Sequence, residues 1–371
     1  MPIPEQDKDI TAIIDIHAIK HNIHYLQQKT QTPIMPVIKA NAYGHGIIEI
    51  ANILRKLDVQ YLGVATLGEA IQLRNSGDVG RILAWMYNIR GPEMVDAVQM
   101  EIDIAIFDES FVPILSKIAE KTGKKIKATI YVDTGMNRAG VPYERAINVC
   151  RHVHSAKYFE FVGLMSHLVC SDTPNCKFVH QQLSSFRKLR AQLESIGIFP
   201  PLVHIANTGA CLHYNVSDFT ISRPGCGVFG INTVNRMYRP LKIAMTVVSH
   251  IVQIKSVEKG AGIGYYSEYI ATRNMQICIV PIGYADIIPW NLAGPLHVYI
   301  NGTKRNVLGQ INMDQIVVQS RPNDRMNMHV FLFGNGTNCP QTIYHISKLS
   351  GNKTTEILSR LGNRIYRKYI K

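Results

Sequence analysis

Short apolar runs alternate with amphipathic segments along the first 240 residues of the chain. The amphipathic segments carry apolar residues at helical spacing, whereas the short runs are rich in Val, Ile and Ala. The predicted strands are 34–39, 61–65, 82–86, 102–107, 126–133, 161–167, 203–206 and 219–222. The predicted helices are 17–28, 47–57, 67–75, 92–100, 111–121, 143–154 and 178–196. Such alternation is typical of parallel strands joined by crossover helices.

The number of these strands decides between two architectures. Eight strands in about two hundred residues favour a closed (β/α)8 barrel of the TIM type, which typically has ~250 residues. An open doubly wound sheet is the alternative, and a glycine fingerprint after the first strand would favour it. The turn at 42–46 reads AYGHG instead, so we predict the barrel.

The pattern changes after residue 240. Strand-like runs with turn residues replace the helical periodicity, and Asn301-Gly302 between two of them is a strong hairpin signal. Two short helical segments, TIYHISKLSG and TTEILSRLG, precede the C-terminus. We therefore predict an α/β barrel domain at 1–240 and a mainly β domain at 241–371, with one early strand at 11–16.

Composition is that of an ordinary soluble globular protein. The chain has 371 residues, of which 46% are hydrophobic and 18% charged, which fits about two domains with full cores. No apolar stretch is long enough to span a bilayer, and MPIPEQDKDI lacks the pattern of a secretory signal, so we expect a cytoplasmic protein without membrane contact. The net charge of +13 is spread over helix faces, which favours solvated surface or small anions over nucleic acid.

The seven cysteines show no paired metal spacing, so we predict no metal site. They are Cys150, Cys170, Cys176, Cys211, Cys226, Cys278 and Cys339. The nearest pair in sequence is Cys170 and Cys176, and a cytoplasmic location favours two free thiols there.

Candidate chemistry lies where the predicted strands end. Lys39 closes an apolar run, where lost hydration would make its amine a usable nucleophile, although a lysine can also simply end a strand. Arg138, His167, Thr208 and Arg223 follow later strands. Each has an ordinary structural role open to it, but the working residues of a barrel gather at this rim. Together with the lysine they predict a site.

The stretch PVIKANAYGHG, residues 36–46, resembles the pyridoxal-phosphate (PLP) signature of the alanine racemase family, and the domain organisation is similar across nearly the whole chain. The resemblance implies that Lys39 carries PLP as a Schiff base and that Arg223 faces the pyridine nitrogen. It further implies cofactor-binding roles for Tyr43, His167, Asn207, Thr208, Gly225, Cys226 and Asn363. It also implies that strand 11–16 pairs with the C-terminal domain.

Racemisation needs a base on each face of the substrate α-carbon. Lys39 is one, and the resemblance of GIGYYSEY, residues 262–269, implies that Tyr265 of a partner subunit is the other, with Tyr266 as the fallback. Without the resemblance, these tyrosines would be expected in packing. The implied assembly is a head-to-tail homodimer with shared active sites. The implied substrate-binding residues are Arg138, Tyr284, Met313 and Asp314.

The implied function is interconversion of L-alanine and D-alanine, supplying D-alanine for peptidoglycan. Four positions depart from the family pattern: Tyr131, where many members have a carbamylated lysine, Gln310, Asn312 and Asn363. Asn137 or a bound anion is the candidate to orient Arg138 instead. Asn363 stands where many members have a tyrosine that crowds the substrate, so serine or broader specificity is an open alternative.

Two other functions compete with racemisation. A barrel-fold PLP decarboxylase would present a carboxylate to the pyridine nitrogen and a run of glycines to the phosphate, where this chain has Arg223 and Gly225. A non-catalytic PLP carrier would lack a second domain, whereas this chain continues for about 130 residues beyond the barrel.

Overall fold

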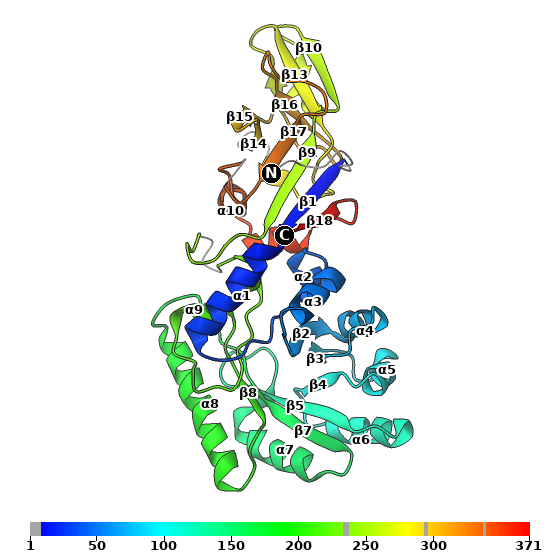
Figure 1. Cartoon of the computed structure of the whole chain (residues 1–371), viewed down its shortest axis with the longest axis vertical. Coiled ribbons are helices and arrows are strands. Elements are labelled where there is room, and N and C mark those ends of the chain that lie inside the picture. The colour runs from blue at the N-terminus through cyan, green and yellow to red at the C-terminus, as the bar shows by residue number, and fades with distance from the viewer. Residues whose placement is uncertain (1–8, 233–236, 293–295, 337–338) are drawn as a thin grey trace.

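A computed structural model describes residues 9–232, 237–292, 296–336 and 339–371. The molecule is elongated, with the helix-rich barrel at one end and a strand-rich region at the other (Figure 1). No helix in these ranges is long and apolar enough to cross a membrane.

Six parallel strands form the continuous part of the barrel. They are β2 (Tyr61–Thr66), β3 (Arg81–Met86), β4 (Asp103–Ile106), β5 (Ile126–Asp133), β7 (Phe159–Met165) and β8 (Leu202–His204). The short strand β6 (Val141–Pro142) pairs beside β5. Two predicted strands, 34–39 and 219–222, close the ring through isolated bridges, Val37 to Gly63 and Ile34 to Ser222. The predicted TIM-type barrel is confirmed, with bridges in place of two full strands.

Helices cover the outside of the barrel (Figure 1). They are α1 (Ile16–Thr30), α3 (Ile47–Arg55), α4 (Leu67–Asn75), α5 (Glu93–Gln99), α6 (Phe111–Thr122), α7 (Tyr143–Ser155), α8 (Lys177–Ser195) and α9 (Thr208–His213). The start of α4 shows why the sequence folds this way. The Thr66 hydroxyl accepts the Glu69 N–H at 3.2 Å, and the Glu69 carboxylate accepts the Thr66 N–H at 3.1 Å, which is a capping box.

The strand-rich region is built on a mixed sheet in the order β15-β14-β17-β9-β1-β18. Its strands are β1 (Ile10–Asp15), β9 (Met245–His250), β14 (His297–Ile300), β15 (Thr303–Asn306), β17 (His329–Phe333) and β18 (Tyr366–Ile370). A second sheet holds β10 (Gln253–Val257), β13 (Met275–Val280) and β16 (Ile316–Gln319), and a ribbon holds β11 (Gly262–Ile263) and β12 (Tyr269–Ile270).

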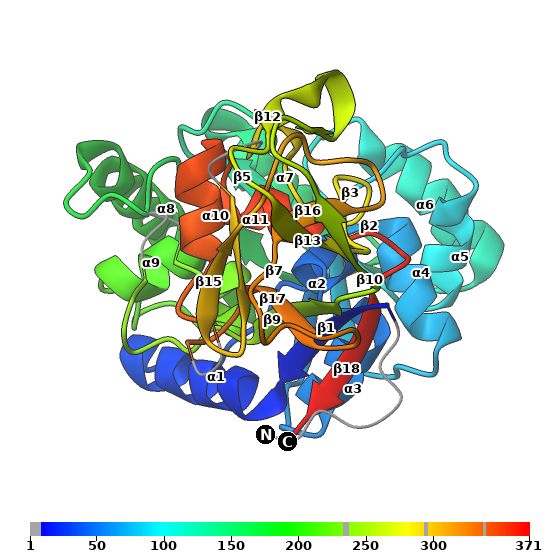
Figure 2. The same cartoon turned by 90° about the horizontal axis from the view of Figure 1, so that it is seen from above.

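Both chain ends meet in the mixed sheet. The early strand β1 pairs with β9 and, in parallel, with β18, so it belongs to the strand-rich region despite preceding the barrel (Figure 2). β18 was not among the predicted strands, and its pairing with β1 places the basic C-terminal residues in the sheet. We propose residue 240 as the boundary between the two domains, since β9 begins just beyond it.

The turn between β14 and β15 is the predicted hairpin. Ile300 pairs with Thr303, and Asn301 and Gly302 have φ of 48° and 68°. Two consecutive positive φ values define the hairpin turn that Asn-Gly favours.

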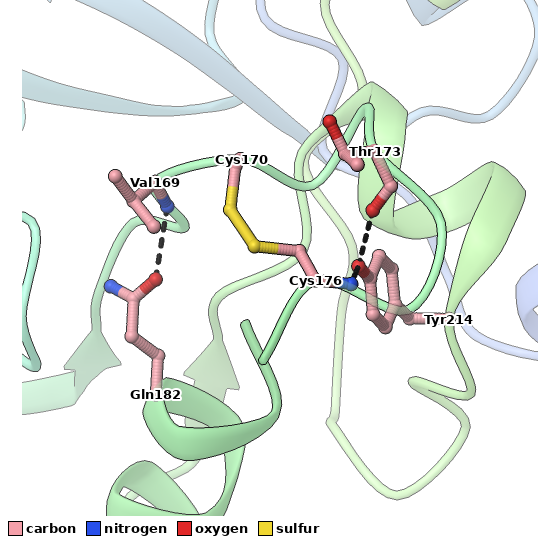
Figure 3. The surroundings of a disulfide bond; sticks show 6 residues. All are labelled: Val169, Cys170, Thr173, Cys176, Gln182 and Tyr214. Carbon is pink, nitrogen blue, oxygen red and sulfur yellow. Dashed lines mark hydrogen bonds between the residues drawn. A yellow bond between two sulfur atoms is a disulfide. The ribbon is translucent and has the colours of Figure 1, made fainter. Parts of the chain in front are cut away.

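The expectation of free thiols at Cys170 and Cys176 was wrong. They form a disulfide with an Sγ–Sγ distance of 2.14 Å (Figure 3). The short segment between them folds back on itself and brings the two Cα atoms to 6.6 Å, within disulfide range. The other five cysteines are free and buried.

Candidate active site

A cavity of about 540 Å³ opens at the carboxyl ends of the barrel strands. It brings together most of the predicted cofactor-binding residues. Those lining it are Lys39, Tyr43, Arg138, His167, Asn207, Thr208, Arg223, Gly225 and Cys226. The strand-end rule thus predicted residues that the fold brings to one cavity, because parallel strands deliver their last residues to one rim. Their roles there stay predictions.

Lys39 stands at the start of an unusual turn. It begins α2 (Lys39–Tyr43), yet Ala40, Asn41, Ala42 and Tyr43 all have φ between 51° and 54°. Left-handed backbone costs non-glycine residues roughly 1–2 kcal/mol each. A turn of this kind persists only where its surroundings fix it, and such strain gathers at functional sites.

Two side-chain contacts fix that turn from the barrel side. The Glu69 carboxylate on α4 accepts the Ala40 N–H at 2.6 Å, and the Asn41 side-chain oxygen accepts the Ile47 N–H at 2.8 Å at the start of α3. Sequence analysis missed Glu69. A glutamate at this position is expected to cap its own helix, and nothing in the sequence indicates that its second carboxylate oxygen binds the turn at Lys39.

His45 supports the turn from the protein interior. It is fully buried and stacks on Phe229 with ring centroids 4.1 Å apart. Its Nδ1 lies 3.0 Å from the carbonyl oxygens of both Ala42 and Tyr43. Burial lowers the pKa of His45 to about 4, so the ring is neutral and donates from Nδ1.

The C-terminal strand completes the support. The Tyr369 hydroxyl donates to the carbonyl of His45 at 2.7 Å, and the Arg367 Nε donates to the carbonyl of Gly44 at 2.7 Å. The GHG of the signature stretch is thus a contact point for β18, which ties the strand-rich region to the turn that carries Lys39.

The electrostatics of the cavity lower the pKa of the Lys39 amine. Loss of hydration lowers the pKa of Lys39, and the nearby Arg138 and Arg223 lower it further, while Glu69 opposes them. Burial and the same cations lower the pKa of His167 to about 3, so this ring is neutral as well. An amine whose pKa is lowered gives up its proton more readily and so becomes a better source of the neutral nucleophile and base.

Arg223 is the most deeply buried charge in the cavity. It is 4% exposed, one guanidinium nitrogen donates to the carbonyl of Ser166, and burial lowers its pKa to about 10. Its Nε has no partner within the described part of the chain. A buried donor without a partner is costly, so this group suits a ligand that accepts a hydrogen bond.

A backbone cradle borders the cavity opposite Lys39. The Thr208 hydroxyl accepts the N–H groups of Gly225 and Gly227, both at 3.1 Å. A Cβ on Gly225 would lie 2.3 Å from the Tyr43 hydroxyl, so only glycine fits beside that phenol. Cys226 begins a 3-10 turn and Thr208 begins α9. First-turn N–H groups lack partners within a helix and attract anions.

The departure at Tyr131 has a clear structural setting. Its side chain is 4% exposed and packs inside the barrel with Met165 and Leu83, at the floor of the cavity. Asn137, the candidate to orient Arg138, bonds through its backbone N–H to Asp133 at 3.2 Å. No hydrogen bond or ion pair holds the Arg138 side chain among the residues that the structure describes.

Four predicted residues lie away from this cavity in the strand-rich region. Tyr265, Tyr284 and Met313 are 65%, 41% and 52% exposed, and Asp314 forms an ion pair with Arg364 at 2.6 Å. Tyr284, Met313 and Asp314 lie together, because the Tyr284 N–H donates to the carbonyl of Asn312 at 3.0 Å and so joins their two loops. Tyr265 lies in the turn between β11 and β12. The four residues are referred to below as the exposed group. None of the four lines the cavity of its own chain.

The placement predicted for Asn363 is not what the structure gives. It lines a separate cavity beside Arg364 and Arg367. The short helix α11 (Thr354–Ser359) instead supplies the wall of the main cavity, and β3 supplies Trp85. The missed wall residues are Trp85, Lys353, Thr355, Glu356 and Ser359. Sequence analysis predicted this helix in TTEILSRLG but did not place it at the cavity, because the strand-end rule covers only the barrel.

The fold and cavity define a class of protein. A barrel with a desolvated lysine at its rim, in a cavity walled by arginines, is an enzyme built to bind an anionic ligand and act with an amine. Residues 14–233 match the family description "Alanine racemase, N-terminal domain", and residues 244–369 match "Alanine racemase, C-terminal domain". The chain therefore belongs to the alanine racemase family, and it is an amino-acid racemase, an isomerase.

Individual relatives agree over nearly the full length. The alanine racemase of Synechocystis is 32% identical over 361 residues, covering 95% of this chain and 97% of that protein. The alanine racemase structure from Streptomyces lavendulae superposes with a TM-score of 0.92 at 28% identity, covering 99% and 98% of the two chains. A histidine racemase structure from Leuconostoc mesenteroides also superposes, with a TM-score of 0.90 at 26% identity over 100% and 99% of the chains.

Proposed function

We propose that the chain binds PLP at Lys39 and interconverts L-alanine and D-alanine. One observation carries the proposal: the desolvated Lys39 amine shares its cavity with Arg138, Arg223 and the Gly225 cradle. When bound, PLP withdraws electrons from the substrate α-carbon and so acidifies its proton. The amine, the anion cradle and the buried donor all suit that cofactor.

We assign each wall of the cavity one task. Thr208, Gly225 and Cys226 would hold the phosphate, with the Tyr43 hydroxyl beside them, and Asn207 would fix the start of α9. Arg223 would donate to the pyridine nitrogen and leave it unprotonated, because a guanidinium cannot accept a proton. The neutral His167 would stand behind it. A weaker electron sink favours return of the proton over side reactions.

We further propose that two bases move the proton, one on each face of the substrate. The Lys39 Nζ serves one face, and the phenolic oxygen of Tyr265 from a partner subunit serves the other. Support comes from exposure: Tyr265, Tyr284 and Met313 are all open to solvent, and none lines the cavity of its own chain. An exposed apolar group of this kind marks an interaction site. Met313, Asp314 and Arg138 would then receive the substrate carboxylate.

Alanine is the first candidate substrate, and we infer a role in supplying D-alanine for peptidoglycan from the family resemblance. Serine or broader specificity is the second candidate. The hypothesis of serine as substrate was first based on Asn363, which does not line this cavity. Thr355 and Ser359 now support it, because their small hydroxyl side chains line the cavity. The histidine racemase among the structural neighbours shows that this fold accommodates larger substrates elsewhere.

The decisive experiment is α-proton exchange in heavy water with L-Ala, D-Ala, L-Ser and D-Ser. We expect exchange with both enantiomers of alanine, and loss of a visible cofactor band after borohydride reduction. Absence of a borohydride-sensitive band would refute PLP binding at Lys39. A band without exchange would instead favour a non-catalytic carrier, and faster exchange with serine would favour the second substrate.

A further inference from the structure

The segment at 166–176, between β7 and α8, lies along α9 beside the cavity. It begins just after β7, and it contains His167 and the Cys170–Cys176 disulfide (Figure 3). The neighbouring helix α9 begins at Thr208, which lines the cavity. The segment is therefore one helix start away from the Thr208 cradle.

Both ends of the segment are held by side chains from neighbouring helices. The buried Gln182 of α8 accepts the Val169 N–H at 2.9 Å and donates to the carbonyl of His167 at 2.9 Å. At the other end, the Tyr214 hydroxyl accepts the Cys176 N–H at 2.9 Å and donates to the carbonyl of Thr173 at 2.6 Å (Figure 3). The disulfide joins these two held ends.

The middle of the segment touches the start of α9 directly. The buried Ser171 hydroxyl donates to the Asn207 side-chain oxygen at 2.6 Å, and the same oxygen caps the helix by accepting the Ala210 N–H at 3.1 Å. A Cβ on Gly209 would lie 2.7 Å from the backbone of Ser171 and Asp172, so the two backbones are in close contact. Ser171 thus fixes the cap whose next residue is Thr208.

We propose that the Cys170–Cys176 disulfide positions Ser171 against Asn207, so that the redox state of this one bond sets how tightly the cavity holds its cofactor. This inference rests on the proposed binding of PLP. In the oxidised protein, the short covalent loop holds Ser171 on the cap of α9. Reduction allows the loop to move, so that Ser171 no longer holds the Asn207 side chain in place. The start of α9 at Thr208 is then less firmly fixed.

The reductive step has a simple balance. A small dithiol supplies two electrons and two protons, the Sγ–Sγ bond breaks into two thiols, and the dithiol becomes a cyclic disulfide. Cys170 and Cys176 are both partly exposed, whereas the five free cysteines are buried. A dithiol in solution therefore reaches this pair before the rest.

The experiment compares PLP affinity of the full-length apoprotein before and after reduction. One portion is treated with dithiothreitol and desalted without oxygen. Thiols counted after denaturation should rise from five to seven per chain. We expect the dissociation constant for PLP, titrated through the visible band, to rise roughly three- to tenfold, the value of one lost hydrogen bond.

Three variants make the result specific. The double variant C170A/C176A should bind PLP like the reduced protein and show no response to dithiothreitol. S171A should bind like the reduced protein while its disulfide is intact. C150A removes a buried thiol on α7 and should keep the full response.

Equal affinity in the oxidised and reduced proteins, at five and seven thiols, would overturn the inference, as would a full response in C170A/C176A. Seven thiols in the protein as purified from an oxidising buffer would also overturn it. A protein that binds no PLP in either state would refute the proposed function instead, so the two failures are distinguishable.

Discussion

The two groups of predicted site residues differ in how much of their environment a single chain provides. In the barrel, Arg223 is 4% exposed and Tyr43 is packed between Gly225 and Phe229. In the strand-rich region, Tyr265 is 65% exposed and Met313 is 52% exposed. The named barrel residues are buried by their own chain, whereas the named residues of the strand-rich region are open to solvent.

This difference separates ligand binding from catalysis. Side chains locked by packing can bind a cofactor in one chain, because their geometry needs no further ordering. An exposed phenol has no fixed position and no low-dielectric surroundings, so it needs a second protein surface before it can act at a defined atom. We therefore expect cofactor binding to survive changes that abolish the exposed group.

Replacing Lys39 by alanine tests the buried group and should have the largest effect. Loss of the amine removes both the covalent attachment and one base, so exchange of both alanine enantiomers should fall by at least about a thousandfold. The measurement is α-proton exchange, together with the borohydride-sensitive band. K29A, on the exposed face of α1, is the matched control. Exchange by K39A at a tenth of the normal rate would contradict the assignment.

Replacing Tyr265 by phenylalanine tests the exposed group. The variant should keep its visible PLP band, but exchange of the L-alanine proton should fall by about a hundredfold or more, and far more than that of D-alanine. Y266F is the comparison, because Tyr266 is the fallback for the same role and is 89% exposed. A larger loss in Y266F than in Y265F would move the second base to Tyr266. Equal losses for the two enantiomers would refute the assignment of one base to each face.

Mixing K39A and Y265F sharpens the comparison. If the two groups meet across a homodimer, random reassociation places unlike chains in half of the dimers, and each of these has one intact site. Activity should then recover to about one quarter of normal, because one of the two sites is intact in half of the dimers. This count holds for a two-fold dimer, in which each chain contributes the same surface to the interface. Recovery absent after verified subunit exchange would show that both groups act within one chain.

Sequence analysis was strong for the barrel and weak elsewhere, for a physical reason. Strand β5 matches its predicted range because it is a mainly apolar run buried on both faces, and helix α4 matches because it begins at the Thr66–Glu69 capping box. The predicted strands at 34–39 and 219–222 are reduced to isolated bridges and the basic strand β18 was not predicted, because their pairing is set by neighbouring strands.

The same limit applies to the site. The barrel residues could be found because parallel strands end at one rim. Three other features could not be found in this way: Glu69, Thr355 and the Cys170–Cys176 disulfide. Each depends on how the chain is arranged in the folded protein, and no local sequence pattern indicates that arrangement. Asn363 is close to α11 in sequence but lines the separate cavity, so its contact with the cofactor stays a prediction.

Substrate preference gives a smaller test of the cavity wall. T355Y should lower the efficiency with serine relative to alanine by about tenfold, because a larger ring fills space that a hydroxymethyl group would need. N363Y should leave the ratio unchanged, since that residue lines the separate cavity. The measurement is the ratio of kcat/KM for the two amino acids. A larger change for N363Y than for T355Y would return the specificity to Asn363.

Acid should lower the free energy of unfolding through the buried histidine below the Lys39 turn, His45. This is the smallest effect that we predict. Burial holds its pKa at about 4 in the folded protein, against about 6.5 in an unfolded chain. The unfolded chain therefore takes up this proton first, and the stabilisation from neutral His45 is complete above pH 6.5 and lost between about 6.5 and 4. His45 therefore contributes at most about 1.4 kcal/mol per pH unit to the change of the free energy of unfolding with pH.

The measurement is urea unfolding at pH 6.5 and 5.5. H45Q starts less stable, but its free energy of unfolding should fall less between these pH values, by the amount that one proton contributes. H24Q, at an exposed position on α1, should keep the full dependence. Equal pH slopes in H45Q and H24Q would mean that the ring beneath the Lys39 turn already carries its proton.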